Sequence, residues 1–151
     1  MSVIVQKNDF DISKEVHKIC ENKKNVGAVV TFVGLVRDMN SGRKVNAITL
    51  EHYPKMTKKA LESIVLQAKT RWKTEGIRLI HRYGTLKPSD QIVLVIVSSQ
   101  HRKDAFEACE FLMDFLKTQA PFWKKEVTDS GESWVEFRTS DELAANRWVR
   151  N

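Results

Sequence analysis

The segment from Lys117 to Glu126 carries the most unusual reactive side chains of the chain. Its sequence, KTQAPFWKKE, joins the end of an apolar helical pattern to a proline, two aromatic residues and two further lysines. Proline cannot continue a helix, so we expect the chain to reverse at Pro121 and to bring Lys117 near Lys124. Two ammonium groups about 4 Å apart repel by roughly 4 kcal/mol at an effective dielectric constant of about 20. One of them then loses its proton more easily, which is the usual route to a lysine base or nucleophile.

Two further basic groups follow apolar strands. The sequence Ser-Ser-Gln at 98–100 leads into His101 and Arg102, between the most apolar predicted strand and a long predicted helix. Free N–H groups at a helix start bind phosphate, and these two side chains would add donors and charge. Arg37 follows the apolar run 31–36, where a guanidinium at the rim of the core can reach an anion.

Each basic group also has a simpler interpretation, which the sequence leaves open. Lys117 can merely complement the negative end of its helix, and Lys125 can be an ordinary solvated lysine. The 98–102 segment can be a helix cap followed by exposed polar residues, and Arg37 can be a surface arginine.

Other kinds of catalytic centre find little support. Cys20 and Cys109 stand alone, without CxxC or histidine-rich spacing, so no zinc site, disulfide framework or catalytic cysteine is predicted. His52 and His81 fall within predicted strands and are interpreted as structural histidines. The chain contains no GxGxxG or GKS/T motif and no carboxylate pair typical of glycosidases. We therefore predict neither a metal nor a bound cofactor.

Composition limits the class of protein. The 151 residues are 42% hydrophobic and 29% charged, which fits one folded domain over residues 1–151 and excludes a disordered chain. No uncharged run approaches the roughly 20 residues that cross a bilayer, and the N-terminus lacks signal-peptide features. We expect a cytoplasmic protein. A net charge of +6 favours anionic ligands.

Hydrophobic periodicity predicts the elements that position these groups. Strands are expected at 3–6, 26–36, 45–53, 77–83, 92–98, 122–128 and 134–138, and helices at about 12–22, 56–74 and 103–118. Predicted helix caps are Asp9 or Asp11, Thr57, and Ser98 or Ser99. Residues 38–44 and 84–90 are expected to be loops, Gly76 ends the second helix, and 139–151 is a short helix or tail. Strands in pairs predict an α+β fold with a largely antiparallel sheet, packed helices and an extra C-terminal hairpin.

Five motifs in order resemble the MoaE family, the large catalytic subunit of molybdopterin synthase. Each is weak alone, but their order and spacing together are specific, and the resemblance runs from about residue 26 to residue 148, nearly the whole chain. They are GAVVTFVGLVR at 27–37, LEHYP at 50–54, HRYG at 81–84, SQHR at 99–102 and LKTQAPFWKKE at 116–126.

The resemblance implies an α/β-hammerhead-like fold and a sulfurtransferase of molybdenum cofactor biosynthesis. Such an enzyme converts a cyclic pyranopterin monophosphate, precursor Z, into the dithiolene molybdopterin. The sulfur comes from the C-terminal Gly-Gly thiocarboxylate of a small ubiquitin-like subunit. The family assembles as a heterotetramer with a large-subunit homodimer at its centre, and it uses no cysteine of its own for the transfer.

The resemblance also implies a set of site residues. The family's pocket maps onto Leu35, Val36, Arg37, His101, Arg102, Lys117, Lys124, Lys125 and Glu126. Lys117 and Lys124 match the catalytic lysines, and which of them is the base stays open. We hypothesise that Arg37 and Lys124 neutralise the two anionic partners and that Lys117 assists proton transfer. Leu35 is expected to contribute its backbone, because this position varies in the family.

Two other functions compete with the enzyme. The positive charge permits a nucleic-acid-binding module, in which Phe122, Trp123 and Trp134 would stack on bases. Against it, these aromatic residues do not interleave with basic residues on an evident strand face, and no RRM, KH or OB signature occurs. The second competitor is a purely structural dimer module, which is the default if the pocket lysines prove dispensable.

Overall fold

The first sheet is built around the most apolar strand of the sequence. The computed structural model describes residues 2–135 and 139–149. Its first sheet has the order β1-β5-β7-β2, formed by β1 (Val3–Gln6), β5 (Gly76–Arg82), β7 (Gln91–Ser99) and β2 (Ala28–Leu35). The β1–β5 pair is parallel and the other two pairs are antiparallel.

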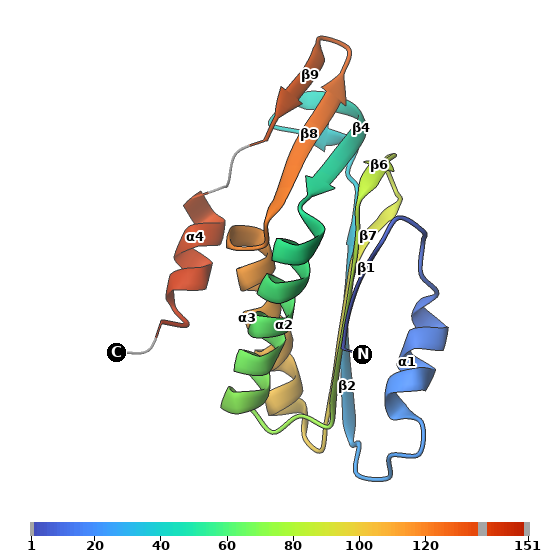
Figure 1. Ribbon diagram of the computed structural model, residues 1–151, viewed down its shortest axis with the longest axis vertical. Coiled ribbons are helices and arrows are strands. Elements are labelled where there is room, and N and C mark those ends of the chain that lie inside the picture. The colour runs from blue at the N-terminus through green and yellow to red at the C-terminus, as the bar shows by residue number, and fades with distance from the viewer. Residues whose placement is uncertain (1, 136–138, 150–151) are drawn as a thin grey trace.

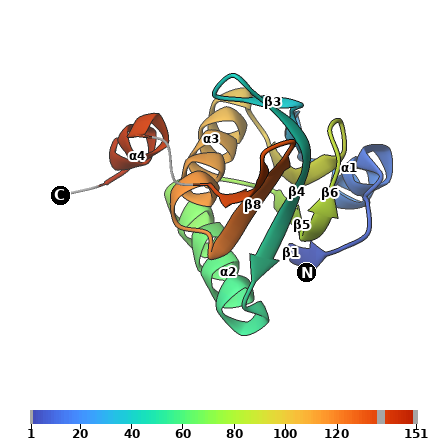
Figure 2. The same ribbon diagram turned by 90° about the horizontal axis from the view of Figure 1, so that it is seen from above.

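Helices cover both faces of this sheet, as Figures 1 and 2 show. Helix α1 (Ile12–Cys20) lies on one face, and α2 (Pro54–Arg71) and α3 (Arg102–Thr118) lie on the other. The alternation of side chains along β7 divides its apolar residues between the two layers. Val93, Val95 and Val97 pack in the core cluster that contains α2 and α3, whereas Leu94 and Ile96 pack toward α1.

A second, entirely antiparallel sheet stands above the ends of α2 and α3 in Figure 1. Its order is β3-β4-β8-β9, and the additional strand β6 pairs with β4. The strands are β3 (Met39–Asn40), β4 (Arg43–His52), β6 (Gly84–Leu86), β8 (Phe122–Thr128) and β9 (Gly131–Trp134). The predicted α+β class, the largely antiparallel pairing and the C-terminal hairpin β8–β9 are thereby confirmed. The α/β-hammerhead-like description fits this two-sheet arrangement.

The C-terminal segment forms a fourth helix, α4 (Thr139–Asn146), which lies beside α3. Arg147 forms ion pairs of 2.6 Å with Glu110 and 2.7 Å with Asp114. The indole of Trp148 donates to the same Asp114 carboxylate at 2.6 Å and meets Trp72 edge-on. The short-helix interpretation of 139–151 therefore holds for residues 139–146. No helix in the described part of the chain is both long and apolar enough to cross a membrane.

The predicted caps are correct only for the first helix. Asp11 caps α1 by accepting a hydrogen bond from the Lys14 amide at 3.1 Å. Thr57 lies inside α2, which begins after Tyr53 because Pro54 fits the first helical turn. Ser98 and Ser99 are the last residues of β7, and His101 occupies the cap position of α3 without a side-chain hydrogen bond.

Several predicted boundaries and loops are also wrong. Gly76 begins β5 instead of ending α2, which stops at Arg71. The predicted loops at 38–44 and 84–90 contain the short strands β3 and β6, because each pairs with β4. The last strand of the hairpin is Gly131–Trp134, whereas the prediction placed it at 134–138, and 136–138 lie outside the described residues. The extent of the single domain over 1–151 stays a prediction.

Candidate active site

A cavity of about 420 Å³ lies where the two sheets meet the end of α3. Its wall is formed by the end of β2, by β3, β4 and β8, by His81 near the end of β5, and by the last turn of α3. The register of the β2–β7 pair shifts between Gly34 and Leu35, which marks a β-bulge beside the cavity just before β2 ends. Segments that are distant in sequence therefore line one cavity.

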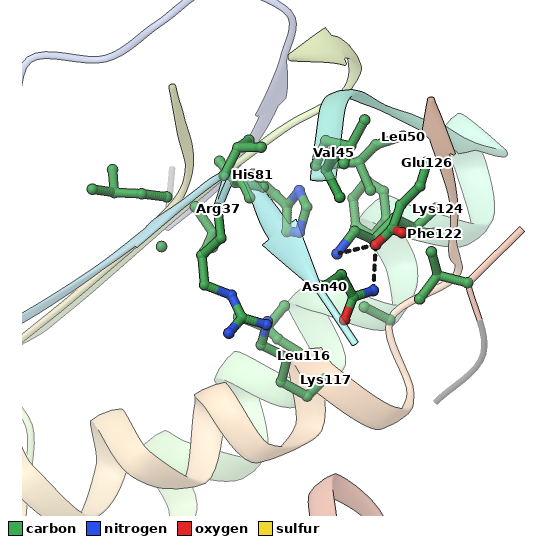
Figure 3. Close-up of a pocket in the computed structure, with 18 of the residues that line it drawn as sticks. Arg37, Asn40, Val45, Leu50, His81, Leu116, Lys117, Phe122, Lys124 and Glu126 are labelled. Carbon is green, nitrogen blue, oxygen red and sulfur yellow. Dashed lines mark hydrogen bonds and ion pairs between the residues drawn. The ribbon is translucent and has the colours of Figure 1, made fainter. Parts of the chain in front are cut away.

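Three cationic side chains line this cavity. Helix α3 ends at Thr118 and β8 begins at Phe122, so the break at Pro121 brings Lys117 and Lys124 to the same pocket. Arg37 follows β2 and reaches toward the end of α3 near Lys117, as Figure 3 shows. The three side chains thus share one cavity, and their chemical roles stay a proposal.

The carboxylate of Glu126 organises one side of the cavity. Glu126 is buried, with 6% of its surface exposed, and its Oε1 accepts a hydrogen bond from Asn40 Nδ2. The same oxygen lies 4.0 Å from Lys124 Nζ, and Figure 3 draws both contacts. A buried carboxylate of this kind holds a half-exposed lysine in place and balances part of its charge. No sequence signal indicated Asn40, which follows from the pairing of β3 with β4.

His81 forms the floor of the cavity together with Phe122. Their rings stack with centroids 3.9 Å apart and an angle of 16° between the planes. His81 Nδ1 lies 2.8 Å from the Arg82 carbonyl oxygen. Burial lowers the pKa of His81 to about 4; the hydrogen bond to Arg82 opposes the change, and the charges of Lys117 and His52 add to it. Sequence reasoning identified His81 only as a structural histidine and missed its position in the cavity.

A second histidine, His52, also packs against Phe122. The ring of His52 lies 5.4 Å from Phe122 and 4.6 Å from Tyr83, between centroids. The Thr57 hydroxyl donates to the Tyr53 carbonyl, so it accepts a hydrogen bond from His52 Nδ1 at 2.9 Å. Burial lowers the pKa of His52 as well. Thr57, predicted to cap a helix, instead fixes this imidazole.

The remaining predicted residues divide into two groups. Leu35, Val36 and Glu126 line the cavity with the three cations. Lys125 does not, because alternate residues of a strand face opposite sides, and it forms an ion pair of 3.3 Å with Glu132 beside the Trp134 ring. Side chains alternate between the two faces of a strand, so the sequence of β8 could have predicted that Lys125 faces away from Lys124 and Glu126.

His101 and Arg102 lie at the opposite end of α3 from Lys117. Arg102 and Lys117 are fifteen helical steps apart, and the rise of about 1.5 Å per residue makes this about 22 Å. Both side chains are exposed and neither lines the cavity. The predicted grouping of all nine residues is therefore not realised within one chain.

The two cysteines and the possible metal ligands of the described residues lie apart from the cavity or from one another. Cys109 is buried in α3, and burial raises the pKa of its thiol to about 11, which keeps it protonated at neutral pH. Cys20 is partly buried at the end of α1. Within residues 2–135 and 139–149, no three His, Cys, Asp or Glu side chains gather as metal ligands would.

The fold and the cavity define a class of protein, an α+β domain with a pocket lined by three cationic side chains. The particular family follows from comparison with known proteins: the model of the MoaE protein family matches residues 5–119, and the chain belongs to this family. A molybdopterin synthase catalytic subunit from Vibrio cholerae is 53% identical over 146 residues, which cover 97% of each chain.

Solved structures agree with this assignment. A molybdopterin biosynthesis MoaE protein from Burkholderia ambifaria superposes with a TM-score of 0.83 at 48% identity, covering 97% of both chains. A complex of subunits 1 and 2 of molybdopterin-converting factor from Helicobacter pylori matches with a TM-score of 0.73 over 91% of this chain and 92% of that chain. Its 22% identity shows the fold alone.

Proposed function

We propose that this chain is the catalytic subunit of a molybdopterin synthase. In two successive transfers it moves two sulfur atoms to precursor Z, each from the C-terminal thiocarboxylate of a small ubiquitin-like subunit, and so forms the dithiolene of molybdopterin. The observation that carries this proposal is the cavity lined by Arg37, Lys117 and Lys124. The similarity to the Vibrio cholerae catalytic subunit supports it over nearly the whole chain.

The charges of the cavity suit two anionic partners. Precursor Z carries a phosphate and the protein tail carries a thiocarboxylate, so the two repel each other when they meet. Desolvating both in a partly enclosed site is costly unless fixed cations compensate. Arg37 follows β2 and Lys124 belongs to β8, so each can hold one anion, while the buried Glu126 keeps Lys124 in place.

Lys117 is assigned to proton transfer. Each of the two transfers forms a bond between sulfur and a pterin side-chain carbon and breaks the bond between sulfur and the acyl carbon. The acyl carbon takes up water, and the small subunit leaves as a carboxylate. The oxygen displaced from the pterin needs a proton, and the attacking water must lose one. Lys117 is an exposed residue on the cavity wall, where its amine can serve both. Holding the reactants together supplies a further part of the rate.

His101 and Arg102 reach such a site only from a second copy of the chain. Because about 22 Å of helix separates them from Lys117, one chain cannot bring both groups to one substrate. In a twofold-symmetric dimer, each copy would offer its α3 start to the other copy's cavity. This arrangement fits a homodimer at the centre of a heterotetramer. We place the assembly in the cytoplasm.

The competing nucleic-acid function gains no support from the aromatic residues. Phe122 is stacked on His81, Trp123 meets Tyr53 edge-on at 4.8 Å, and Trp134 faces Lys125. The three rings thus have separate partners, whereas a binding platform for bases would present them together.

The decisive experiment mixes the purified chain with precursor Z and a thiocarboxylated small subunit. We expect formation of the dithiolene pterin and release of the small subunit as its carboxylate. A control with the unmodified small subunit should yield no product. Failure of the complete mixture to form dithiolene, while precursor Z and the small subunit are both shown to be intact, would overturn the proposal and leave the structural dimer module.

A further inference from the structure

His81 presents one unprotonated nitrogen to the cavity. A carbonyl oxygen can only accept, so the contact between His81 Nδ1 and the Arg82 carbonyl places the ring proton on Nδ1. The ring is neutral at pH 7, because burial keeps its pKa at about 4. In the neutral ring the other nitrogen, Nε2, carries a lone pair and acts as an acceptor.

This second nitrogen has no hydrogen-bond partner among the described residues. Within the described residues, every fully buried side-chain nitrogen or oxygen has a hydrogen-bond partner. Nε2 of His81 makes no hydrogen bond in this part of the chain, so it is not fully buried, although 92% of the residue's surface is covered. His81 lines the cavity, and Figure 3 shows its ring between Arg37 and Phe122. The acceptor therefore lies at the cavity wall.

The other polar groups of the cavity are mainly hydrogen-bond donors, so Nε2 of His81 can complement the N–H groups of a ligand. Arg37, Lys117 and Lys124 are all donors, and the Glu126 carboxylate is already engaged by Asn40 and Lys124. The only other carboxylate among the described lining residues is that of Asp141 on α4, so His81 supplies the uncharged imidazole acceptor on the β5 side. A ligand that carries both anionic groups and N–H donors needs an acceptor in addition to these cations. The pterin ring system is such a ligand, because its phosphate is anionic and its fused rings display N–H groups in the ring plane.

We infer that His81 Nε2 accepts a hydrogen bond from an N–H group of the pterin ring and so fixes the orientation of the rings in the cavity. The inference rests on the proposed function, since precursor Z is the ligand it concerns. His81 is thus a binding residue that determines which edge of the pterin faces β5. The Phe122 stack and the Arg82 hydrogen bond hold the imidazole at the required angle.

Two substitutions separate this acceptor from the structural role of the ring. In His81→Asn, the side-chain N–H₂ can still donate to the Arg82 carbonyl, but no atom extends to the place of Nε2. In His81→Gln, the longer amide places an oxygen near that position. Leaving one buried N–H of the ligand without an acceptor costs about 1–3 kcal/mol, which corresponds to roughly a tenfold to hundredfold loss of affinity.

The test measures equilibrium binding of precursor Z by pterin fluorescence, without the small subunit, followed by steady-state kinetics with it. For His81→Asn we expect a Kd and a KM raised about tenfold to a hundredfold with kcat changed less than about threefold. His81→Gln should recover most of the affinity. Wild-type affinity in a folded His81→Asn variant would overturn the inference. If the wild-type chain itself formed no dithiolene, the proposed function would fail instead.

A second measurement is independent of any variant's folding. The ¹⁵N resonance of Nε2 in the wild-type protein reports directly on its hydrogen bonding. Addition of precursor Z should move this resonance upfield, toward the value of a hydrogen-bonded nitrogen, while Nδ1 changes little. An unchanged Nε2 resonance at saturating precursor Z would show that the ligand does not use this acceptor.

Discussion

His81 and Phe122 stack face to face, with ring centroids 3.9 Å apart, and join the two sheets of the molecule. His81 belongs to β5 in the first sheet, and Phe122 is the first residue of β8 in the second. Phe122 also follows directly on the break between α3 and β8. The stack therefore fixes where the second sheet begins relative to the first, and with it the positions of Lys117 and Lys124 in the cavity.

The buried His81 predicts a loss of stability in mild acid. In the unfolded chain its pKa returns to about 6.5, so below this pH the unfolded state binds a proton that the folded state does not. Stability is complete above about pH 6.5 and declines as the pH falls toward 4. Between pH 7 and 5 we expect a decrease of about 2 kcal/mol in the free energy of unfolding, measured by urea denaturation.

The control for this prediction is His81→Asn, which cannot titrate. Its stability should fall less steeply between pH 7 and 5 than that of the wild type. Some decline remains, because burial also lowers the pKa of His52. Parallel pH profiles for the variant and the wild type would contradict the assignment to His81.

Lys117→Ala should abolish most activity without unfolding the protein. The side chain is exposed at the last turn of α3, so its truncation is expected to change stability by less than about 1 kcal/mol. Loss of a group that stabilises charge or moves protons in the transition state costs about 10²–10³ in kcat. Single-turnover formation of dithiolene measures this step. Lys59→Ala, an exposed lysine of α2 outside the cavity, should retain wild-type rates.

Glu126→Gln should weaken substrate binding more than it weakens the fold. The amide keeps the shape and can still accept the hydrogen bond from Asn40, but it removes the charge opposite Lys124. We expect kcat/KM to fall about tenfold and stability to change by less than about 1 kcal/mol. Glu126→Ala also removes the acceptor for Asn40 and should cost about 1–3 kcal/mol in urea denaturation. Equal stability of the two variants would show that the hydrogen bond to Asn40 contributes little.

The sequence was most informative where one local rule decided the structure. The run QIVLVIVSS is apolar enough to require a strand buried on both faces, and Pro121 requires a reversal that brings Lys117 and Lys124 together. Asn40 and Glu126 meet across 86 residues of sequence, and no local pattern encodes such a pairing. The sequence predicted one helix between Arg102 and Lys117, and the length of this helix already implied that the two residues lie far apart within one chain.

Gly27→Ala should destabilise the protein and disturb the start of α3. A Cβ atom at this position would collide with the backbone carbonyl oxygen of Gln100, which cannot rotate away as a flexible side chain would. Such overpacking typically costs about 1–3 kcal/mol. Thermal and urea unfolding measure the loss, and Asn25→Ala, at an exposed position nearby, is the matched control. A Gly27→Ala variant as stable as the wild type would show that the 99–101 segment moves without cost.

Mixed dimers should test whether two chains build each site. If His101 and Arg102 act in the partner's cavity, a dimer of one Lys117→Ala chain and one Arg102→Ala chain contains one cavity with both groups intact. In mixed dimers purified through a tag on each chain, one of the two cavities is then intact, so activity should reach about half of the wild-type value. Co-expression with two affinity tags and the dithiolene assay measure this recovery. Lys117→Ala paired with Lys124→Ala should recover nothing, because both residues line the same chain's cavity and each cavity lacks one of them. Recovery absent from both mixtures, in dimers shown to contain both chains, would mean that Arg102 does not serve the neighbouring cavity.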